Sequence, residues 1–328
     1  MSKLQILAVV GPTAGGKSAL ALSLAERLGG EIVSCDSMQV YRRMNIGTAK
    51  PTEEEQKRIP HHLIDIVEPD TPFSCADYVT LAAEAIEDCA GRGKLPIVCG
   101  GTGLYLDALL RKCDFEPMTT DEEIRRGLLA YAEAEGAEAL WQRLCKVDPE
   151  SAEATHPNNV KRVVRALEIY EVSGITKTEL DRRSRLGGDR YESCVIGLRY
   201  TDRDRLYRRI DSRVDEMLHM GLVEETRRLA DEGVFEKNQT AAQAIGYKEL
   251  LPFCRGECSL AEAADALKMA TRRYAKRQIT WFSAKEYVQW IDVDGEKEKT
   301  FEEIVNCACA LFQTNGNCGK MSVEDLLM

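Results

Sequence analysis

Short apolar runs alternate with amphipathic stretches in the N-terminal part of the chain. The run Leu4–Val10 is unbroken, which is typical of a parallel strand that is buried on both faces. Similar runs at Glu31–Asp36, His62–Val67 and Leu95–Cys99 predict three more strands, and apolar residues at helical spacing over Cys75–Arg92 predict a helix. This alternation predicts an α/β fold in which helices cover both faces of a parallel sheet.

The alternation ends after residues 1–113 and gives way to charged, helix-like sequence. Strand character returns at Ser193–Leu198. We therefore predict that residues 114–189 form a helical insertion domain between two strands of the sheet, and that residues 1–113 and 190–295 together form the core.

Helical periodicity dominates the C-terminal part of the chain. It predicts helices at Asp202–Met220, Val223–Glu232, Ser259–Lys268 and Thr271–Lys285. A short strand is expected at Tyr287–Val293, and residues 296–328 are expected to form a peripheral helix and a tail.

The turn after the first predicted strand carries a phosphate-binding sequence. It fits the pattern G-x-x-x-x-G-K-[ST] with Gly11, Pro12, Thr13, Ala14, Gly15, Gly16, Lys17 and Ser18. Helix formers follow at Ala19–Ala25, so the motif lies between a strand and a helix, as a P-loop must. Backbone N–H groups at the helix start would hold a di- or triphosphate, with Lys17 adding a charge and Ser18 reaching Mg²⁺. The alternative is a plain tight turn, which the flanking elements disfavour; the motif leaves open which phosphate compound binds.

Two further turns should lie at the same edge of the sheet, where parallel α/β folds bind their ligands. Asp36 follows the second strand and could act as a general base, accept a hydrogen bond from a substrate amine, bind a metal or cap a helix. Gly100–Tyr105 follows the fourth strand; its glycines would let a ligand approach the backbone, and Thr102 supplies a hydroxyl. Gly47–Pro51 offers another turn with a lysine.

Histidine and cysteine residues give no sign of a metal site. His61 and His62 have no carboxylate or cysteine at ligand spacing, so we interpret them as structural. The 12 cysteines lack zinc-site spacing and are expected to be reduced thiols.

Composition excludes some classes of protein and qualifies others. No apolar run is long enough to cross a membrane and no signal peptide precedes the first strand, so we expect a cytoplasmic protein. A net charge of −10 argues against a globally basic nucleic-acid-binding protein. Basic residues are nevertheless clustered at Lys161–Arg165, Arg203–Arg213 and Arg272–Arg277, either as solvated helix faces or as local contacts to a polyanion.

A P-loop kinase of a small molecule is one interpretation of these features. The insertion would serve as its lid, but Asp65 is the only candidate for a strand-end acid that holds Mg²⁺, and it is a weak one. A diphosphate leaving group would need the same cradle without phosphoryl transfer. The residues considered one by one leave both interpretations open.

The ordered set of motifs resembles one family, the tRNA dimethylallyltransferases, also called tRNA isopentenyltransferases, in their bacterial form. The matching segments are Gly11–Ser18, Asp36–Tyr41, Gly47–Pro51, Pro60–Asp65, Gly100–Tyr105, His156–Arg162, Arg165–Glu168, Ala244–Glu249, Thr271–Gln278 and Thr280–Phe282. They lie within residues 4–295, and the complete set is far more specific than the P-loop alone.

The resemblance implies a P-loop NTPase-like core and a transferase that uses Mg²⁺. Its reaction moves a dimethylallyl group from dimethylallyl diphosphate to the exocyclic amine of an adenosine and releases diphosphate. That adenosine lies just 3′ of the anticodon in tRNAs reading codons that begin with U. Asp36 and Thr102 would be catalytic, Gly11–Ser18 with Arg209 and Arg213 would bind the diphosphate, and Ser18 would bind the metal.

The resemblance also implies contacts to the tRNA anticodon stem-loop, whose target base can be splayed out of a single-stranded loop. The implied RNA-binding residues are Asp36, Ser37, Met38, Gln39, Thr102, Arg125, Asn158, Asn159, Lys161, Arg162, Arg272, Arg273, Lys276 and Arg277. We expect a monomer with no membrane partner.

Overall fold

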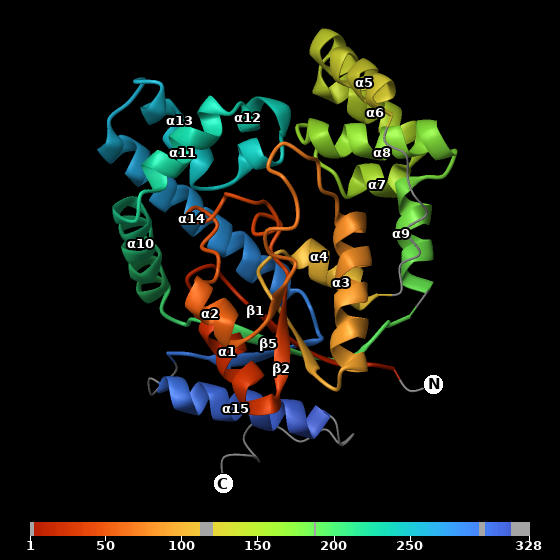
Figure 1. Ribbon diagram of the computed structural model, residues 1–328. Helices are drawn as coiled ribbons and strands as arrows, with labels where there is room; N and C mark the ends of the chain where they lie inside the picture. Colours follow the sequence, from red (N-terminus) through yellow and green to blue (C-terminus); the bar gives the residue numbers. More distant parts are fainter. Residues whose placement is uncertain (1–2, 112–120, 187, 295–298, 316–328) are drawn as a thin grey trace. The chain divides into compact units, whose positions relative to one another are not determined.

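The computed structural model describes residues 3–111, 121–186, 188–294 and 299–315. The chain divides into two compact units, one made of Met1–Leu109 with Tyr191–Met328 and the other of Leu110–Arg190 (Figure 1). The predicted boundary at residues 113–114 lies outside the described residues, as do residues 316–328 of the predicted tail.

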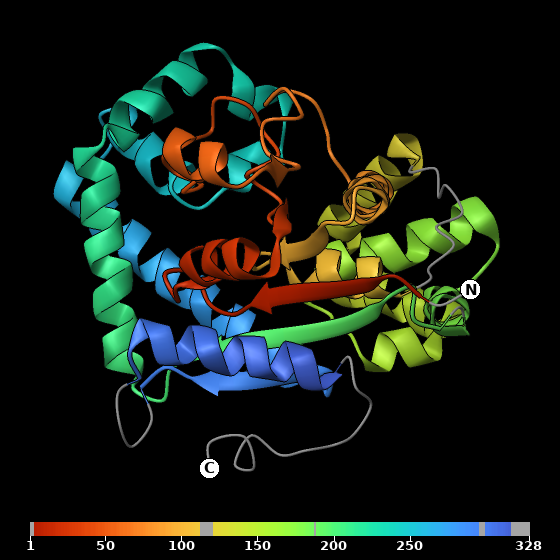
Figure 2. The ribbon, with the colours of Figure 1, turned by 60° about the horizontal axis from the view of Figure 1, so that its bottom comes forward.

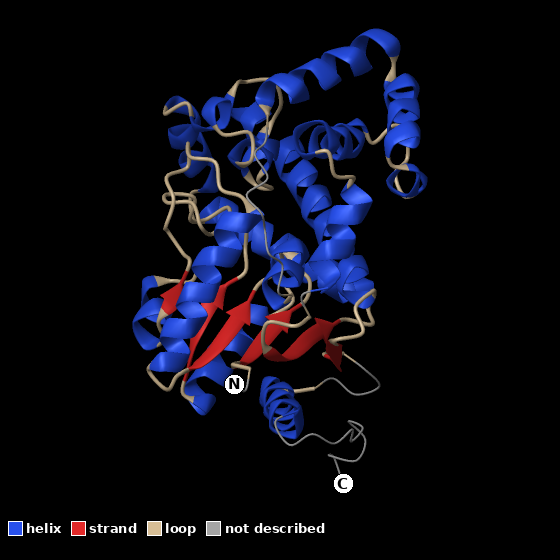
Figure 3. Cartoon of the chain, turned by 90° about the vertical axis from the view of Figure 1, so that its right-hand side faces the viewer, coloured by secondary structure: helices blue, strands red, loops and turns tan. Residues whose placement is uncertain are grey.

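Six strands form one sheet in the first unit. They are β1 (Gln5–Val10), β2 (Gly30–Ser34), β3 (His61–His62), β4 (Leu95–Cys99), β5 (Glu192–Arg199) and β6 (Val288–Asp292). Their order is β3-β2-β4-β1-β5-β6, and every neighbouring pair is parallel, so all arrows in Figure 3 point the same way. This confirms the predicted α/β fold. Because β2, β4 and β1 are adjacent, the turns that follow them meet at one edge of the sheet.

Helices pack around this sheet in the first unit, and a separate set of helices makes up the second unit. The first unit contains α1 (Lys17–Leu28), α2 (Glu53–Arg58), α3 (Cys75–Gly91), α4 (Gly103–Leu110), α10 (Arg203–His219), α11 (Leu222–Asp231), α12 (Val234–Lys237), α13 (Tyr247–Cys254), α14 (Leu260–Ser283) and α15 (Phe301–Asn315). The second unit contains α5 (Glu122–Glu135), α6 (Ala137–Val147), α7 (Pro149–Glu153), α8 (Val160–Ser173) and α9 (Lys177–Leu186). No helix in the described part of the chain combines the length and apolar character needed to span a membrane.

The third strand is shorter than its apolar pattern predicts. We expected a strand over His62–Val67, but β3 consists of two residues. Leu63 and Asp65 have φ values of 62° and 56°, a left-handed conformation that an extended strand cannot contain.

The two helices expected at Ser259–Lys268 and Thr271–Lys285 are a single helix, α14, of 24 residues. Ser259 begins it with a capping box in which the side chains of Ser259 and Glu262 each accept a backbone N–H of the other residue. Neither glycine nor proline interrupts the sequence between the two predicted helices, so the helix continues.

The main apolar core lies between the sheet and α1, α10 and α15. Side chains Ile6 to Val9 of β1 are fully buried, as expected for a central strand covered on both faces. Helix α15 also buries Val305 and Ala308 completely and lies along α1 (Figure 2). This described part of the predicted peripheral segment therefore belongs to the core.

A buried carboxylate organises a second apolar cluster in the first unit. Glu225 on α11 accepts backbone N–H groups of Asn45, Ile46 and Gly47 at 2.9–3.1 Å, and the Tyr247 hydroxyl at 2.7 Å. A Cβ at Gly47 would lie 2.6 Å from the Tyr247 ring, so this loop requires glycine there. The anionic side chain thus fixes the loop that leads into residues 48–51.

We expect Glu225→Gln to destabilise the protein by about 2 kcal/mol or more, because the amide replaces one acceptor oxygen with a donor that faces N–H groups. The measurement is urea unfolding of the purified protein. Glu224→Gln is the matched control, since Glu224 is the exposed preceding residue of the same helix. Equal unfolding free energies for the two variants would contradict this role of Glu225.

Candidate functional site

A pocket opens at the carboxyl ends of β1, β2 and β4. Six of the residues predicted from the sequence line it together: Thr13, Lys17, Ser18, Asp36, Gln39 and Arg213. Residues from the 48–51 loop and from α14 complete its wall, including Thr48, Ala49, Tyr274 and Gln278. The structure therefore brings the P-loop, the turn after β2 and one basic residue of α10 into a single cavity.

The P-loop has the backbone shape of an anion cradle. Gly11, Ala14 and Gly16 have φ values of 139°, 58° and 94°, which turn the chain sharply before α1. A Cβ at Gly11 would lie 2.8 Å from the carbonyl oxygen of Leu198, so this position has no room for a side chain. Two loop carbonyls accept side-chain donors: Pro12 O accepts Nζ of Lys17 from the loop itself at 2.8 Å, and Ala14 O accepts Nε of Arg209 from α10 at 2.9 Å.

Two cations in the pocket lie in an environment that disfavours their charge. Burial lowers the pKa of Lys17 to about 8, and burial also lowers the pKa of Arg213. Neither side chain forms an ion pair with any of the described residues. A bound anion would compensate both charges, so the pocket is electrostatically suited to a diphosphate.

Arg209 and Arg213 of α10, the two arginines expected to bind the diphosphate, lie in different environments. Arg213 lines the pocket, whereas Arg209 is exposed and supports the P-loop through the Ala14 carbonyl. The sequence could not separate their roles, because both lie on one face of the same helix.

Asp36 and Thr102 hold the turns after β2 and β4. Asp36 Oδ1 accepts the backbone N–H groups of Met38 at 2.9 Å and Gln39 at 3.4 Å, which leaves Oδ2 without a hydrogen bond among the described residues. Thr102 Oγ1 accepts the N–H of Ser37 at 3.1 Å and donates to Ser37 Oγ at 3.4 Å. Asp36 lines the pocket, and Thr102 joins the adjacent turns beside it.

The side-chain carboxamide of Gln39 forms its hydrogen bonds with other residues of the protein. Its Oε1 accepts the Ser34 hydroxyl at 2.9 Å, and its Nε2 donates to the carbonyls of Thr48 and Ala49 at 3.2 Å each. The side chain thereby attaches the 48–51 loop to the end of β2.

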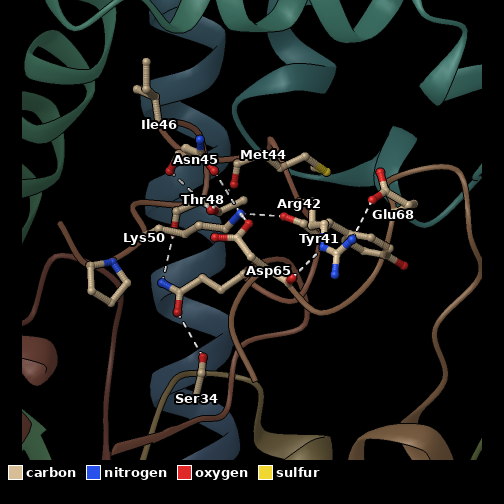
Figure 4. A network of polar contacts seen from close by, with 12 residues as sticks. Ser34, Tyr41, Arg42, Met44, Asn45, Ile46, Thr48, Lys50, Asp65 and Glu68 are labelled. Carbon is tan, nitrogen blue, oxygen red and sulfur yellow. Dashed lines mark hydrogen bonds and ion pairs between the residues drawn. The ribbon is translucent and has the colours of Figure 1, made fainter. Parts of the chain in front are cut away.

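An ion pair between Lys50 and Asp65 also stabilises the 48–51 loop, on the side away from the pocket (Figure 4). Lys50 Nζ donates to Tyr41 O at 2.5 Å, to Asn45 Oδ1 at 2.9 Å and to Asp65 Oδ1 at 2.5 Å, so all three of its protons are used. Its side chain is only 5% exposed. Asp65, the weak candidate for a metal-holding strand-end acid, is paired here and does not line the pocket.

The glycines after β4 are required by close packing within the protein, and Gly100 also lines the pocket, so the approach of a ligand to this turn stays a prediction. A Cβ at Gly100 would lie 2.0 Å from Cys35 O, one at Gly101 would lie 1.9 Å from Gln278 Nε2, and one at Gly103 would lie 2.2 Å from the Trp281 ring. The turn is therefore packed directly against β2 and α14.

Gln278 of α14 connects the two sides of the pocket. Its Oε1 accepts the backbone N–H of Thr13 at 2.8 Å, and its Nε2 donates to Gly101 O at 3.1 Å. The residue is 4% exposed. Our sequence analysis gave it no role, since nothing in a helical pattern shows which polar side chain faces a distant loop.

The described residues contain one group of three metal-ligand side chains, Glu31, His62 and Cys89. Glu31 already accepts donors from Arg92 at 2.5 and 2.7 Å and from His62 at 2.8 Å, and the Arg92 guanidinium holds its pKa down to about 2. This group is a satisfied ion-pair network.

The pocket offers a different set of oxygen atoms. The Ser18 hydroxyl and the Asp36 carboxylate supply oxygen ligands of the kind that Mg²⁺ prefers, so these residues fit a metal ion bound together with a diphosphate.

The basic residues of α14 are not equivalent. Arg272 pairs with Asp211 of α10 through Nε at 3.0 Å and through Nη2, so it docks two helices together. Arg273, Lys276 and Arg277 are exposed, and the guanidinium of Arg277 lies 5.6 Å from the Tyr274 ring centroid.

The second unit contains the remaining predicted RNA-binding residues. Lys161 and Arg162 are exposed in the first turn of α8, which follows the exposed Asn158 and the N-cap Asn159. Arg125 of α5 is half-exposed and forms an ion pair with Glu168 at 2.9 Å.

Comparison with known proteins gives consistent results. The family model described as IPP transferase matches residues 39–285, and the one described as isopentenyl transferase matches residues 4–66. A tRNA dimethylallyltransferase of Thermoanaerobacter sp. (strain X514) is 47% identical over 92% of this chain and 95% of its own length. One from Geobacillus thermodenitrificans is 50% identical over 89% of this chain and 92% of its own length.

Solved structures agree with these sequence matches. The tRNA isopentenylpyrophosphate transferase of Bacillus halodurans has a TM-score of 0.70 at 43% identity, covering 96% of this chain and 99% of that one. A eukaryotic dimethylallyltransferase acting on tRNA has a TM-score of 0.79 at 29% identity, covering 95% of this chain and 80% of that one. The chain therefore belongs to the tRNA dimethylallyltransferase family, as its ordered motifs indicate.

Proposed function

We propose that this protein transfers a dimethylallyl group from dimethylallyl diphosphate to the exocyclic amine of the adenosine 3′ of the anticodon in tRNAs that read codons beginning with U. The main support is that one pocket joins an anion cradle to the Asp36 carboxylate. A transferase that expels diphosphate and accepts a proton from an amine needs both groups within one cavity.

The cradle stabilises the leaving diphosphate. Negative charge develops on its bridging oxygen as the bond to the allylic carbon breaks. Lys17, Arg213 and the P-loop N–H groups meet that charge in a partly dehydrated site, where they are worth more than in water. A Mg²⁺ ion held by Ser18 and the diphosphate oxygens would supply further charge stabilisation.

Asp36 acts on the acceptor side. The adenosine amine attacks the allylic carbon and must then lose a proton. Asp36 Oδ1 is fixed by the N–H groups of Met38 and Gln39, so the carboxylate presents Oδ2 to the amine. Thr102 and Ser37 keep this turn beside the one after β4.

The RNA is held by exposed cations. Arg273, Lys276 and Arg277 lie on the same helix as the pocket residues Tyr274 and Gln278, so they would contact the phosphates next to the inserted base. The insertion, with Asn158, Asn159, Lys161 and Arg162, would also contact the stem-loop. We also propose that the enzyme works in the cytoplasm as a monomer.

The test is transfer of label from dimethylallyl diphosphate to unmodified tRNA by the purified protein in the absence of ATP. We expect transfer to the adenosine beside the anticodon. A small-molecule kinase would consume ATP and leave the tRNA unlabelled, and that result would replace our proposal.

The Lys17 pKa leads to a prediction about pH. At pH values below about 8 the free enzyme carries the Lys17 charge, and above this value the charge is lost. We expect kcat/KM for dimethylallyl diphosphate to fall as pH rises through about 8. kcat should fall only at higher pH, because the bound anion raises the Lys17 pKa. A level kcat/KM profile up to the ordinary lysine pKa of 10.5 would contradict this assignment.

Replacing Asp36 separates catalysis from folding. In Asp36→Asn the carboxamide oxygen can still accept the Met38 and Gln39 N–H groups, but the side chain cannot take the amine proton. We expect this substitution to lower the single-turnover rate by about 10²–10⁴-fold with an unchanged melting temperature. An unchanged rate would mean that Asp36 only caps its turn.

Replacing cations of α14 tests the RNA surface. We expect the double variant Arg273→Ala with Arg277→Ala to weaken tRNA binding and to flatten its log–log salt dependence by about 0.7 for each lost phosphate contact. Binding of dimethylallyl diphosphate should be unaffected. The control is Lys3→Ala with Lys94→Ala, two exposed lysines at the amino ends of β1 and β4, away from the pocket edge. Identical salt slopes for both double variants and the wild type would place the RNA elsewhere.

A further inference from the structure

A fully buried carboxylate in the second unit joins two helices. Glu168 of α8 is 0% exposed. Its Oε2 accepts Nη2 of Arg125 from α5 and Nη1 of Arg165 from the preceding turn of α8, both at 2.9 Å. Its Oε1 is buried and has no hydrogen-bond partner in the described structure.

This arrangement is a costly way to hold two helices together. Burying a charged group is expensive even when it is paired, and apolar residues of similar size often stabilise a core better. The neighbouring contacts between α5 and α8 are apolar, with Leu128 and Val164 almost fully buried. The ion triad therefore requires an explanation other than stability.

The two arginines present most of their donors to solvent. The side chains of Arg125 and Arg165 are 42% and 36% exposed, while the carboxylate between them is buried. A guanidinium has five N–H donors, and each of these guanidinium groups donates once to Glu168. Lys161 and Arg162 lie one turn before Arg165 on the same helix and are exposed.

We propose that Glu168 is a positioning residue that fixes Arg125 and Arg165 as a preformed clamp for a phosphate of the tRNA substrate. The inference rests on the proposed function, because it assumes that the insertion contacts tRNA. Guanidinium groups bind phosphate oxygens through paired N–H donors, so their relative orientation matters. Holding both side chains before binding avoids the entropy cost of ordering them in the complex.

The sign of the expected effect distinguishes positioning from bulk electrostatics. Glu168→Gln removes one negative charge, which by itself should strengthen binding to a polyanion. A positioning role predicts the opposite. We expect the Kd and KM for tRNA to rise about tenfold, while kcat and the KM for dimethylallyl diphosphate stay at wild-type values.

The matched control is Glu171→Gln. Glu171 lies on the same helix and pairs with Arg143 at 2.9 Å, with both side chains partly exposed. The variant removes the same charge, so its tRNA affinity should be unchanged or slightly higher. Melting temperatures of both variants are measured, and the assays are run well below them.

A coupling measurement completes the test. In a background with Arg125→Ala and Arg165→Ala, Glu168→Gln should have no further effect on tRNA affinity, because its role acts through these arginines. If Glu168→Gln does not fold, Arg125→Lys keeps the charge but loses the planar fork, and it should weaken tRNA binding several-fold.

The outcomes are separable. If Glu168→Gln has a lower melting temperature but binds tRNA as tightly as the wild type, the triad has a purely structural role. Wild-type tRNA affinity in Arg125→Lys would lead to the same conclusion. Binding is measured independently of transfer. Wild-type protein that binds tRNA but prenylates nothing would therefore overturn the proposed function, while weaker binding by Glu168→Gln would still support the clamp.

Discussion

The carboxamide of Gln278 is the interaction on which the geometry of the pocket depends. Its acceptor atom binds the P-loop at Thr13, and its donor atom binds the turn after β4 at Gly101. The distance between the diphosphate cradle and the acceptor side is therefore set by one side chain of α14. The contact also explains why position 101 must be glycine, because a Cβ would occupy the place of the carboxamide nitrogen. The same helix carries the exposed cations proposed to hold RNA, so a single rigid element would align both substrates.

The P-loop favours an anionic ligand because its carbonyl groups already accept hydrogen bonds from the protein. Pro12 O accepts Lys17, Ala14 O accepts Arg209 and Gly15 O accepts the Tyr200 hydroxyl at 3.4 Å. Each of these donors comes from a side chain, so the carbonyl dipoles are compensated by the protein itself. What remains for a ligand is positive potential from Lys17, Arg213 and the helix start. Burial lowers the pKa values of both cations, so a bound anion would stabilise their charged forms.

Local patterns predict the parts of this site that are contiguous in sequence. The P-loop, the turn at Asp36 and the strand Leu95–Cys99 could be located because motif and strand lie side by side in the chain. The contacts of Gln278 and Glu225 could not, since their partners are far away in sequence and neither helix pattern indicates them. The short β3 was missed for a different reason: its apolar residues continue, but positive φ angles end the strand.

Some basic residues of this acidic protein form ion pairs within the protein, and others do not. Arg92, Lys50, Arg272 and Arg143 all lie against carboxylates and so hold elements together. Lys17 and Arg213 in the pocket, and Arg273, Lys276, Arg277, Lys161 and Arg162 on the surface, have no such partner among the described residues. These seven cations are among those that the proposed function assigns to the diphosphate and to RNA, and the lack of a carboxylate partner leaves their charges available to these substrates. A net charge of −10 is compatible with RNA binding because binding depends on the local potential around these side chains, which their neighbours leave positive.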